Sequence, residues 1–249
     1  MTDPAIEISS LSKSFGSGPT KNQALQNLSL SIAQGEVFGF LGPNGAGKST
    51  TIKLLLRFLK PDSGSLRILG NTVGQDEFRD RIGYLSEFPF FYDHLTARET
   101  LLLSGRLSGM NRQAIDQRIP MLLARMNLSG PADRRVGGFS KGMKQRLGMA
   151  NALVHDPAVL IFDEPMSGLD PVGRHQIKSL IAELKQEGKT IFFSSHILSD
   201  IEALCDRIGV IHKGVLLYSG GLGDFLPPGC GLEERFVNVI EEADHAGAA

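Results

Sequence analysis

The chain has 249 residues, 41% of them hydrophobic and 21% charged, so it is long and apolar enough to fold around a sizeable core. Its 26 basic and 27 acidic residues give a net charge of −1, which argues against a nucleic-acid-binding protein. The two cysteines lack zinc-ligand spacing, the start lacks a signal-peptide pattern, and no apolar run reaches the roughly 18 residues of a membrane span. We therefore expect a cytosolic protein with reduced thiols that reaches a membrane only through a partner.

The first third of the chain is predicted to be rich in strands. Short, partly alternating β segments lie at residues 6–16, 25–42 and 64–70, and they are broken by Gly and Asn. Between the second and the third, a helix that begins at Thr51 is expected to stop before Pro61.

The middle of the chain, from Thr96 to about Leu153, has apolar residues at helical spacing. Helices are predicted over residues 96–107, 112–126 and 139–153. Ser140 is expected to cap the last of these, and a small residue, a glycine and two lysines near its start are typical of a phosphate-binding helix N-terminus.

Continuous apolar strands return in the last third and alternate with helices. This alternation predicts a parallel α/β sheet covered on both faces, with the helical block inserted between its strands. The chain then becomes rich in Pro and Gly, and the tail from Asp244 onward is expected to be frayed. The predicted strands are residues 158–162, 190–195 and 207–211, and the predicted helices are residues 173–188 and 197–205.

The stretch GPNGAGKST matches G-x-x-x-x-G-K followed by Ser or Thr, between an apolar strand and a helix. Small residues let backbone N–H groups surround the α- and β-phosphates of a nucleotide. Lys48 is expected to reach the β- and γ-phosphates, and the Ser49 hydroxyl to ligate Mg²⁺. The predicted nucleotide-binding residues are Gly42, Pro43, Asn44, Gly45, Ala46, Gly47, Lys48, Ser49 and Thr50.

Two adjacent carboxylates follow the apolar strand AVLIF. Ligands of α/β sheets bind at the carboxyl ends of the strands. Asp163 is therefore expected to hold Mg²⁺ through its water shell, and Glu164 to polarise the attacking water as a general base. Adjacent acids after a strand are otherwise common solvated loop residues, but the phosphate-binding loop favours the catalytic alternative.

His196 and Phe15 each have two interpretations. His196 follows another apolar strand, where it could cap the next helix or contact the γ-phosphate from the sheet edge that also carries Asp163 and Lys48; we favour the second. Phe15 could be a core residue of the β segments or a ring on which adenine stacks.

Taken in order, Phe15 and the stretches GPNGAGKST, SKGMKQR, LIFDEP, SGLD and SSHILSD resemble the motifs of the nucleotide-binding subunit of an ABC transporter. The resemblance runs from about Ile6 to Ser219 and is highly specific, because it rests on several motifs in a fixed order. It implies an α/β fold: a P-loop NTPase core with a parallel sheet, an N-terminal antiparallel β subdomain and an inserted helical subdomain.

The resemblance implies roles for individual residues. Phe15 is the A-loop aromatic, Val159–Asp163 is Walker B, and Glu164, Lys48 and His196 are catalytic, His196 as the switch histidine. In this family two subunits dock head to tail, and each ATP lies between the P-loop of one and the signature motif of the other. The signature residues, acting in trans, are Ser140, Lys141, Gly142 and Met143, and the D-loop residues are Ser167, Gly168, Leu169 and Asp170.

Two features depart from the family pattern. Lys141 and Met143 replace the usual Gly and Gln of the signature, a variant similar to that of bacterial exporter ATPases for drugs, lipids or polysaccharides. Glu87 occupies the place of the Q-loop glutamine, and we expect it to contribute to the metal site together with Ser49 and Asp163.

The expected organisation is one ABC ATPase domain over residues 1–229, with the helical subdomain at about 88–155, and a short C-terminal extension over 230–249. The expected cofactors are ATP and Mg²⁺. The expected partners are a separate transmembrane permease and a second ATPase subunit, as a homodimer, at the cytoplasmic face of the cell membrane, with no nucleic acid. Export is favoured; an importer ATPase, or a non-transport ATPase acting on ribosomes or DNA, remains an alternative.

Overall fold

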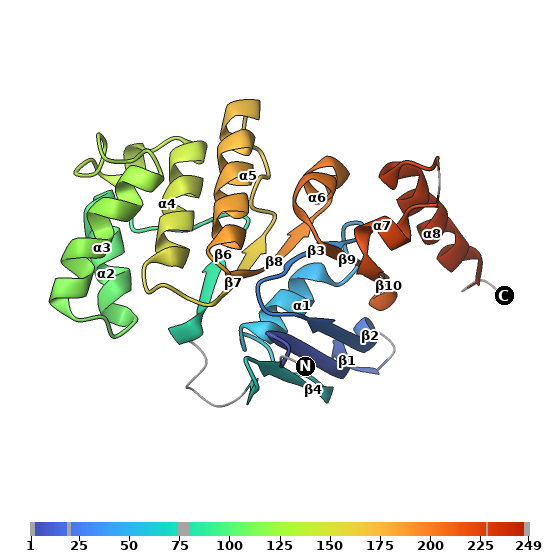
Figure 1. Cartoon of the computed structure of the whole chain (residues 1–249). Coiled ribbons are helices and arrows are strands. Elements are labelled where there is room, and N and C mark those ends of the chain that lie inside the picture. Colours follow the sequence, from blue (N-terminus) through green and yellow to red (C-terminus); the bar gives the residue numbers. More distant parts are fainter. Residues whose placement is uncertain (1–2, 19–20, 74–79, 228, 247–249) are drawn as a thin grey trace. The chain divides into compact units, whose positions relative to one another are not determined.

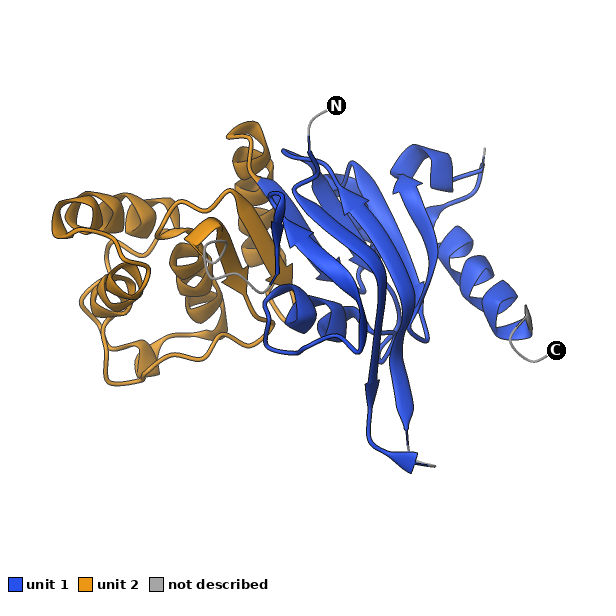
Figure 2. Cartoon of the chain, turned by 90° about the horizontal axis from the view of Figure 1, so that it is seen from below, with its two compact units in different colours: residues 1–78, 190–249 blue, residues 79–189 orange. Residues whose placement is uncertain are grey.

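The chain divides into two compact units (Figures 1 and 2). A computed structural model describes residues 3–18, 21–73, 80–227 and 229–246. Unit 1 comprises residues 1–78 and 190–249, and unit 2 comprises residues 79–189. The helical subdomain expected at about residues 88–155 lies inside unit 2, which also contains two strands and a further helix.

Unit 1 contains an antiparallel sheet with the strand order β2-β1-β4-β5. The central strand β1 pairs with β2 on one side and β4 on the other, both antiparallel. Ile6 and Leu11 of β1 are fully buried, and its polar residues lie closer to the surface, as in a sheet with one face on the core. The strands are β1 (Ile6–Phe15), β2 (Asn22–Ile32), β4 (Ser63–Ile68) and β5 (Asn71–Thr72).

The other strands of unit 1 form a mainly parallel arrangement around β3. Strand β3 is parallel to both β8 and β9, and β10 is antiparallel to β9. All residues of β3 are buried, as are all residues of β8, which is typical of a sheet covered on both faces. The elements are β3 (Val37–Leu41), α1 (Lys48–Leu55), β8 (Thr190–Ser195), α6 (Leu198–Leu204), β9 (Arg207–His212), β10 (Val215–Gly221), α7 (Leu222–Phe225) and α8 (Leu232–Ala246).

Two expectations for unit 1 are wrong. Helix α1 ends at Leu55, and its predicted extension towards Pro61 fails because Arg57 is left-handed, with a φ of 59°. The tail expected to be frayed from Asp244 is helical over residues 244–246, and its last three residues, 247–249, lie outside the described part of the chain.

The end of α8 is fixed by charge. The Asp244 carboxylate contacts Lys213 Nζ at 2.7 Å and His212 Nε2 at 2.6 Å. Hydrogen bonds from Lys213 and His212 lower the pKa of this carboxyl. These partners lie about thirty residues earlier in the chain, which is why the sequence around Asp244 did not reveal them.

Unit 2 contains two parallel strands and the helical block. Strand β6 (Ile82–Leu85) is parallel to β7 (Val159–Asp163), and the three predicted helices of the middle segment are confirmed as α2, α3 and α4. These three helices pack on one another (Figure 1). Thr96, Asn111, Ser140 and Asp170 accept hydrogen bonds from the first turns that they cap. The helices are α2 (Ala97–Leu107), α3 (Arg112–Arg125), α4 (Lys141–Leu153) and α5 (Pro171–Gln186), with a short 3₁₀ turn at Val136–Gly138.

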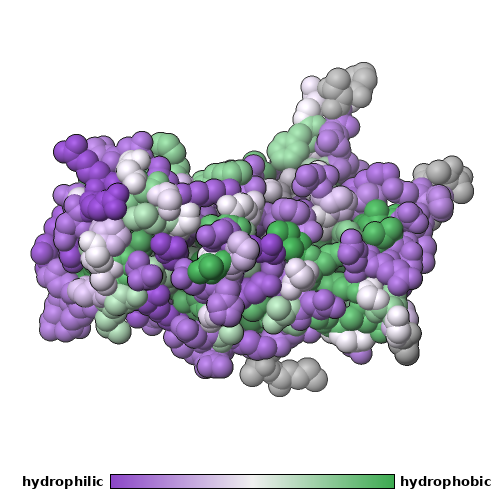
Figure 3. All heavy atoms as spheres, turned by 90° about the horizontal axis from the view of Figure 1, so that it is seen from above, coloured by the Kyte–Doolittle hydropathy of each residue, from purple (hydrophilic) through white to green (hydrophobic). Residues whose placement is uncertain are grey.

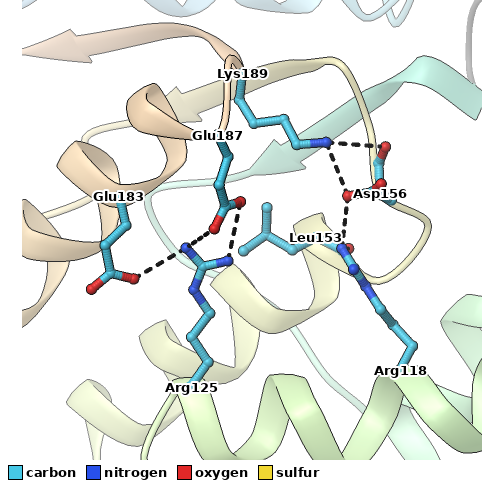
Figure 4. A network of polar contacts seen from close by, with 7 residues as sticks. All are labelled: Arg118, Arg125, Leu153, Asp156, Glu183, Glu187 and Lys189. Carbon is cyan, nitrogen blue, oxygen red and sulfur yellow. Dashed lines mark hydrogen bonds and ion pairs between the residues drawn. The ribbon is translucent and has the colours of Figure 1, made fainter.

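A polar network ties α3 to the rest of unit 2 (Figure 4). Arg118 of α3 donates to the Leu153 carbonyl at 3.1 Å and contacts Asp156 at 2.9 Å. Lys189 contacts the same Asp156 carboxylate at 2.9 Å. Burial raises the pKa of Asp156, but the two cations outweigh that effect and the pKa is lowered.

The second part of this network joins the end of α3 to the end of α5. Arg125 contacts Glu183 at 3.1 Å and Glu187 at 2.8 Å, so one guanidinium bridges two carboxylates (Figure 4). Partly exposed pairs of this kind contribute about 0.2–1 kcal/mol each. They therefore orient α3 more than they stabilise the fold.

Candidate functional site

The GPNGAGKST loop lies in unit 1 between β3 and α1, which confirms the predicted strand–loop–helix arrangement. Gly47 is the N-cap of α1 with a φ of 116°, and a Cβ there would lie 2.8 Å from the Ala24 carbonyl oxygen. Only glycine fits this position. The first backbone N–H groups of α1 have no partner inside the helix, so they can donate to an anion bound in the loop.

Lys48 is buried in this loop, with 7% of its surface exposed. Its Nζ donates to the Gly42 carbonyl at 2.6 Å and to the Pro43 carbonyl at 3.3 Å. Ser49 follows on the first turn of α1 and is exposed. The loop therefore holds a cation and a hydroxyl beside a set of backbone donors, the groups that bind a polyphosphate.

Phe15 and His196 also belong to unit 1. Phe15 is the last residue of β1; its ring is 41% exposed and lies 5.8 Å from Lys13 Nζ, which leaves part of it open for stacking. His196 directly follows β8 and is exposed. The N-cap residue of α6 is Ile197, and its amide donates to Ser195 Oγ at 3.0 Å.

The two adjacent carboxylates lie in unit 2 at the end of β7. Asp163 is half-buried, whereas Glu164 is only 8% exposed and has a left-handed φ of 49°. Burial, together with the negative charge of Asp163, raises the pKa of Tyr84 to about 12. Tyr84 lies on β6, the strand parallel to β7, and was not among the predicted site residues.

The start of α4 has the predicted cap. Ser140 Oγ accepts a hydrogen bond from the Met143 amide at 3.2 Å. Lys141 Nζ lies 5.6 Å from the centre of the Phe88 ring, and a Cβ on Gly168 would clash with the same nitrogen. The signature and D-loop stretches named above therefore meet at Lys141.

Glu87 lies beside the D-loop and a small cavity. Ser167 Oγ donates to Glu87 Oε1 at a long 3.5 Å, and Asp170 ends the D-loop as the N-cap of α5. The cavity has a volume of about 370 Å³. Its lining combines one carboxylate, two lysines, one amide and three apolar rings: Glu87, Phe88, Pro89, Phe139, Lys141, Lys144 and Gln145.

The predicted site residues thus form two sets. Unit 1 carries the phosphate-binding loop, Phe15 and His196, and unit 2 carries both carboxylates, Glu87, the signature and the D-loop. The predicted metal ligands Ser49, Glu87 and Asp163 are divided between the units. Among the residues that the structure describes, no cluster of three or more His, Cys, Asp or Glu side chains could hold a metal ion by itself.

Comparison with known proteins matches residues 25–167 to the family model of the ABC transporter. The chain belongs to the ABC transporter ATP-binding family. The bacitracin transport ATP-binding protein BcrA of Bacillus licheniformis is 45% identical over 85% of this chain and 68% of its own length. The Nod factor export ATP-binding protein I of Rhizobium sp. (strain N33) is 43% identical over 88% of this chain and 72% of its own length.

A solved ABC structure agrees with this assignment. The ATP-binding cassette MJ0796, a dimer in a post-hydrolysis state bound to ADP and Pi, superposes with a TM-score of 0.80 at 25% identity, over 87% of this chain and 98% of that one. The expected α/β fold with its antiparallel β subdomain is therefore confirmed, and this ABC subunit is an ATPase that binds ATP. Of the helices in the described part of this ABC subunit, none has the length and apolar character that crossing a bilayer demands.

Proposed function

We propose that this chain binds head to tail to a second copy of itself when ATP is present and powers export by a separate membrane permease, at the cytoplasmic face of the membrane. The observation that carries the proposal is the presence of two phosphate-binding helix starts, α1 behind Gly47 and α4 behind Ser140, on different units of one chain. A second copy gives the start of α4 a γ-phosphate to bind. Two of the relatives are named for bacitracin transport and for Nod factor export; both names support the transport role, and the second supports its direction.

The proposed nucleotide contacts follow from the chemistry of each group. The Lys48 ammonium exchanges its loop carbonyl partners for oxygens of the β- and γ-phosphates. Adenine stacks on the exposed part of the Phe15 ring, and His196 donates to the γ-phosphate. Ser140 and the Gly142 backbone bind the γ-phosphate of the ATP held by the partner, where the dipole of α4 adds to the attraction.

In the proposed reaction Glu164 is the general base. Its carboxylate takes a proton from a water molecule whose oxygen forms a bond to the γ-phosphorus. The bond between the γ-phosphorus and the bridging oxygen of ADP breaks, and ADP and inorganic phosphate result. The low exposure of Glu164 restricts its access to bulk water, which favours one ordered water as its partner.

The donor set fits Mg²⁺. The Ser49 hydroxyl and the Asp163 and Glu87 carboxylates are oxygen ligands, and Mg²⁺ is usually held by few protein oxygens together with phosphates and water. When bound, Mg²⁺ would neutralise charge on the β- and γ-phosphates.

We expect Glu87→Gln to stay active but to need about tenfold more Mg²⁺ for half-maximal ATPase rate, the scale on which changes around a ligand alter metal affinity. The amide keeps the length of the side chain but loses its charge. A titration of ATPase rate against Mg²⁺, with Glu87→Ala alongside, measures this. Curves that overlay the wild type for both variants would remove Glu87 from the metal site.

The aromatic residues after Glu87 form the proposed docking surface for the permease. Phe88, Phe90 and Tyr92 are 69%, 90% and 59% exposed, so these three rings lie outside the core. The face of the molecule drawn in Figure 3 is largely polar, with apolar patches between the polar side chains. Exposed rings beside the cavity lined by Phe88 and Pro89 suit a short amphipathic helix laid into a groove.

Phe90→Ser and Tyr92→Ser are expected to abolish transport while the isolated subunit keeps its fold and its ATPase rate, because both rings are already in solvent. Co-purification with the permease and uptake into inside-out vesicles measure coupling. Phe58→Ser is the matched control, since it removes a ring from unit 1 whose exposure, 66%, lies between those of Tyr92 and Phe90. Unaltered transport in both variants contradicts the docking surface, and a wild-type chain that co-purifies with ribosomes or DNA contradicts the transport role itself.

A further inference from the structure

Gln145 is a buried amide on α4. It has no role in the phosphate-binding start of that helix or in the proposed chemistry of the carboxylates after β7. Only 1% of its surface is exposed, although glutamine side chains are mostly exposed in proteins. Its Nε2 donates a hydrogen bond to the carbonyl oxygen of Pro165 at 2.8 Å. This contact joins α4 to the turn that carries Glu164.

Glu164 has a backbone conformation that needs support from its surroundings. Its φ of 49° is in the left-handed region, which non-glycine residues rarely adopt. The proline that follows restricts the backbone of Glu164 further. Strained residues of this kind persist only where neighbouring contacts fix them.

Hydrogen bonds hold this turn. The Ser167 amide donates to the Glu164 carbonyl at 3.0 Å. Pro165 has no N–H, so its carbonyl is the backbone group through which a neighbour can hold it by a hydrogen bond. The hydrogen bond from Gln145 to that carbonyl therefore holds the peptide next to the carboxylate.

We propose that Gln145 is a positioning residue for Glu164. It acts through Pro165 and orients the carboxylate towards the attacking water. Because Ser140 caps the same helix, Gln145 moves with the start of α4. The γ-phosphate bound in trans at Ser140 is thus connected to the orientation of the base in the same chain. This inference rests on the proposed role of Glu164 as general base.

The test is Gln145→Met, which keeps the length and unbranched shape of the side chain and removes the donor. We expect kcat for ATP to fall by about ten- to a hundredfold, as for a catalytic group displaced by about an ångström, with KM unchanged because the P-loop is untouched. Backbone hydrogen exchange at Ser167 should become faster, since the turn loses one of its anchors. Gln113→Met, on the exposed face of α3, is the matched control and should match the wild type in each measurement.

A double variant separates this proposal from the one on which it rests. If Gln145 acts by orienting Glu164, Gln145→Met should cause no further loss of kcat in the Glu164→Gln background. The positioning role would be overturned if the loss of kcat in the double variant equalled the product of the two single losses, or if Gln145→Met had a wild-type kcat. Normal turnover in Glu164→Gln alone would overturn the base assignment instead. Should Gln145→Met fail to fold, Gln145→Asn shortens the same amide, and the same outcomes apply.

Discussion

Glu164→Gln is expected to lower the rate of ATP hydrolysis by about a hundredfold or more while ATP binding is retained. The amide keeps the size and hydrogen-bonding capacity of the carboxyl but cannot accept the proton of the attacking water. Glu164 is nearly buried, so few other groups can reach that water in its place. Single-turnover assays of phosphate release and nucleotide-binding titrations measure the two quantities separately.

This variant should also accumulate as an ATP-bound dimer on size exclusion, since hydrolysis is what releases the two subunits. Glu241→Gln, a change of the same kind on the exposed face of α8, is the control and should behave like the wild type. Near-normal turnover in Glu164→Gln would show that another group takes the proton.

Ser140→Arg is expected to abolish hydrolysis with little loss of ATP affinity. The bulky cation blocks the start of α4, while the phosphate-binding loop on the other unit of the same chain is intact. Mixing this variant with Lys48→Ala should restore activity, because one composite site per heterodimer then has a normal P-loop and a normal signature. ATPase assays on mixtures of defined ratio measure the recovery.

ATP affinities of the two single variants can contradict the action in trans. If Ser140→Arg loses ATP affinity as severely as Lys48→Ala, the start of α4 binds the nucleotide of its own chain. Ser129→Arg, an exposed serine outside the helices of unit 2, controls for the added charge and bulk and should retain wild-type rate and affinity.

The chain order of the elements could be predicted largely from local signals. The P-loop pattern predicted the β3–α1 arrangement, because phosphate binding requires glycines and a lysine at a fixed spacing in the sequence. The cap at Ser140 could likewise be predicted, since Ser before an apolar helical pattern satisfies the first amides. Both signals lie within a few residues of the structure that they specify.

Signals that depend on distant partners were not accessible. The end of α8 is held by His212 and Lys213, and the turn at Glu164 by Gln145, contacts that no local pattern contains. Helix α1 ends at Leu55 although its apolar spacing continues, because the left-handed backbone of Arg57 overrides the pattern. Site residues that belong to a sequence motif were therefore predicted. Residues that only hold those motif residues in place were missed.

The bridges from Arg118 and Arg125 of α3 to carboxylates elsewhere in unit 2 have a consequence for how the subunit responds to its medium. Counterions screen exposed charge pairs, and the Debye length shrinks from about 10 Å at 0.1 M to about 3 Å at 1 M ionic strength. Concentrated salt therefore weakens the ion pairs that hold α3 and leaves the packing of the apolar core in place. The rigidity of the helical block becomes a function of ionic strength, and ATPase rates measured in different buffers are comparable only at matched salt.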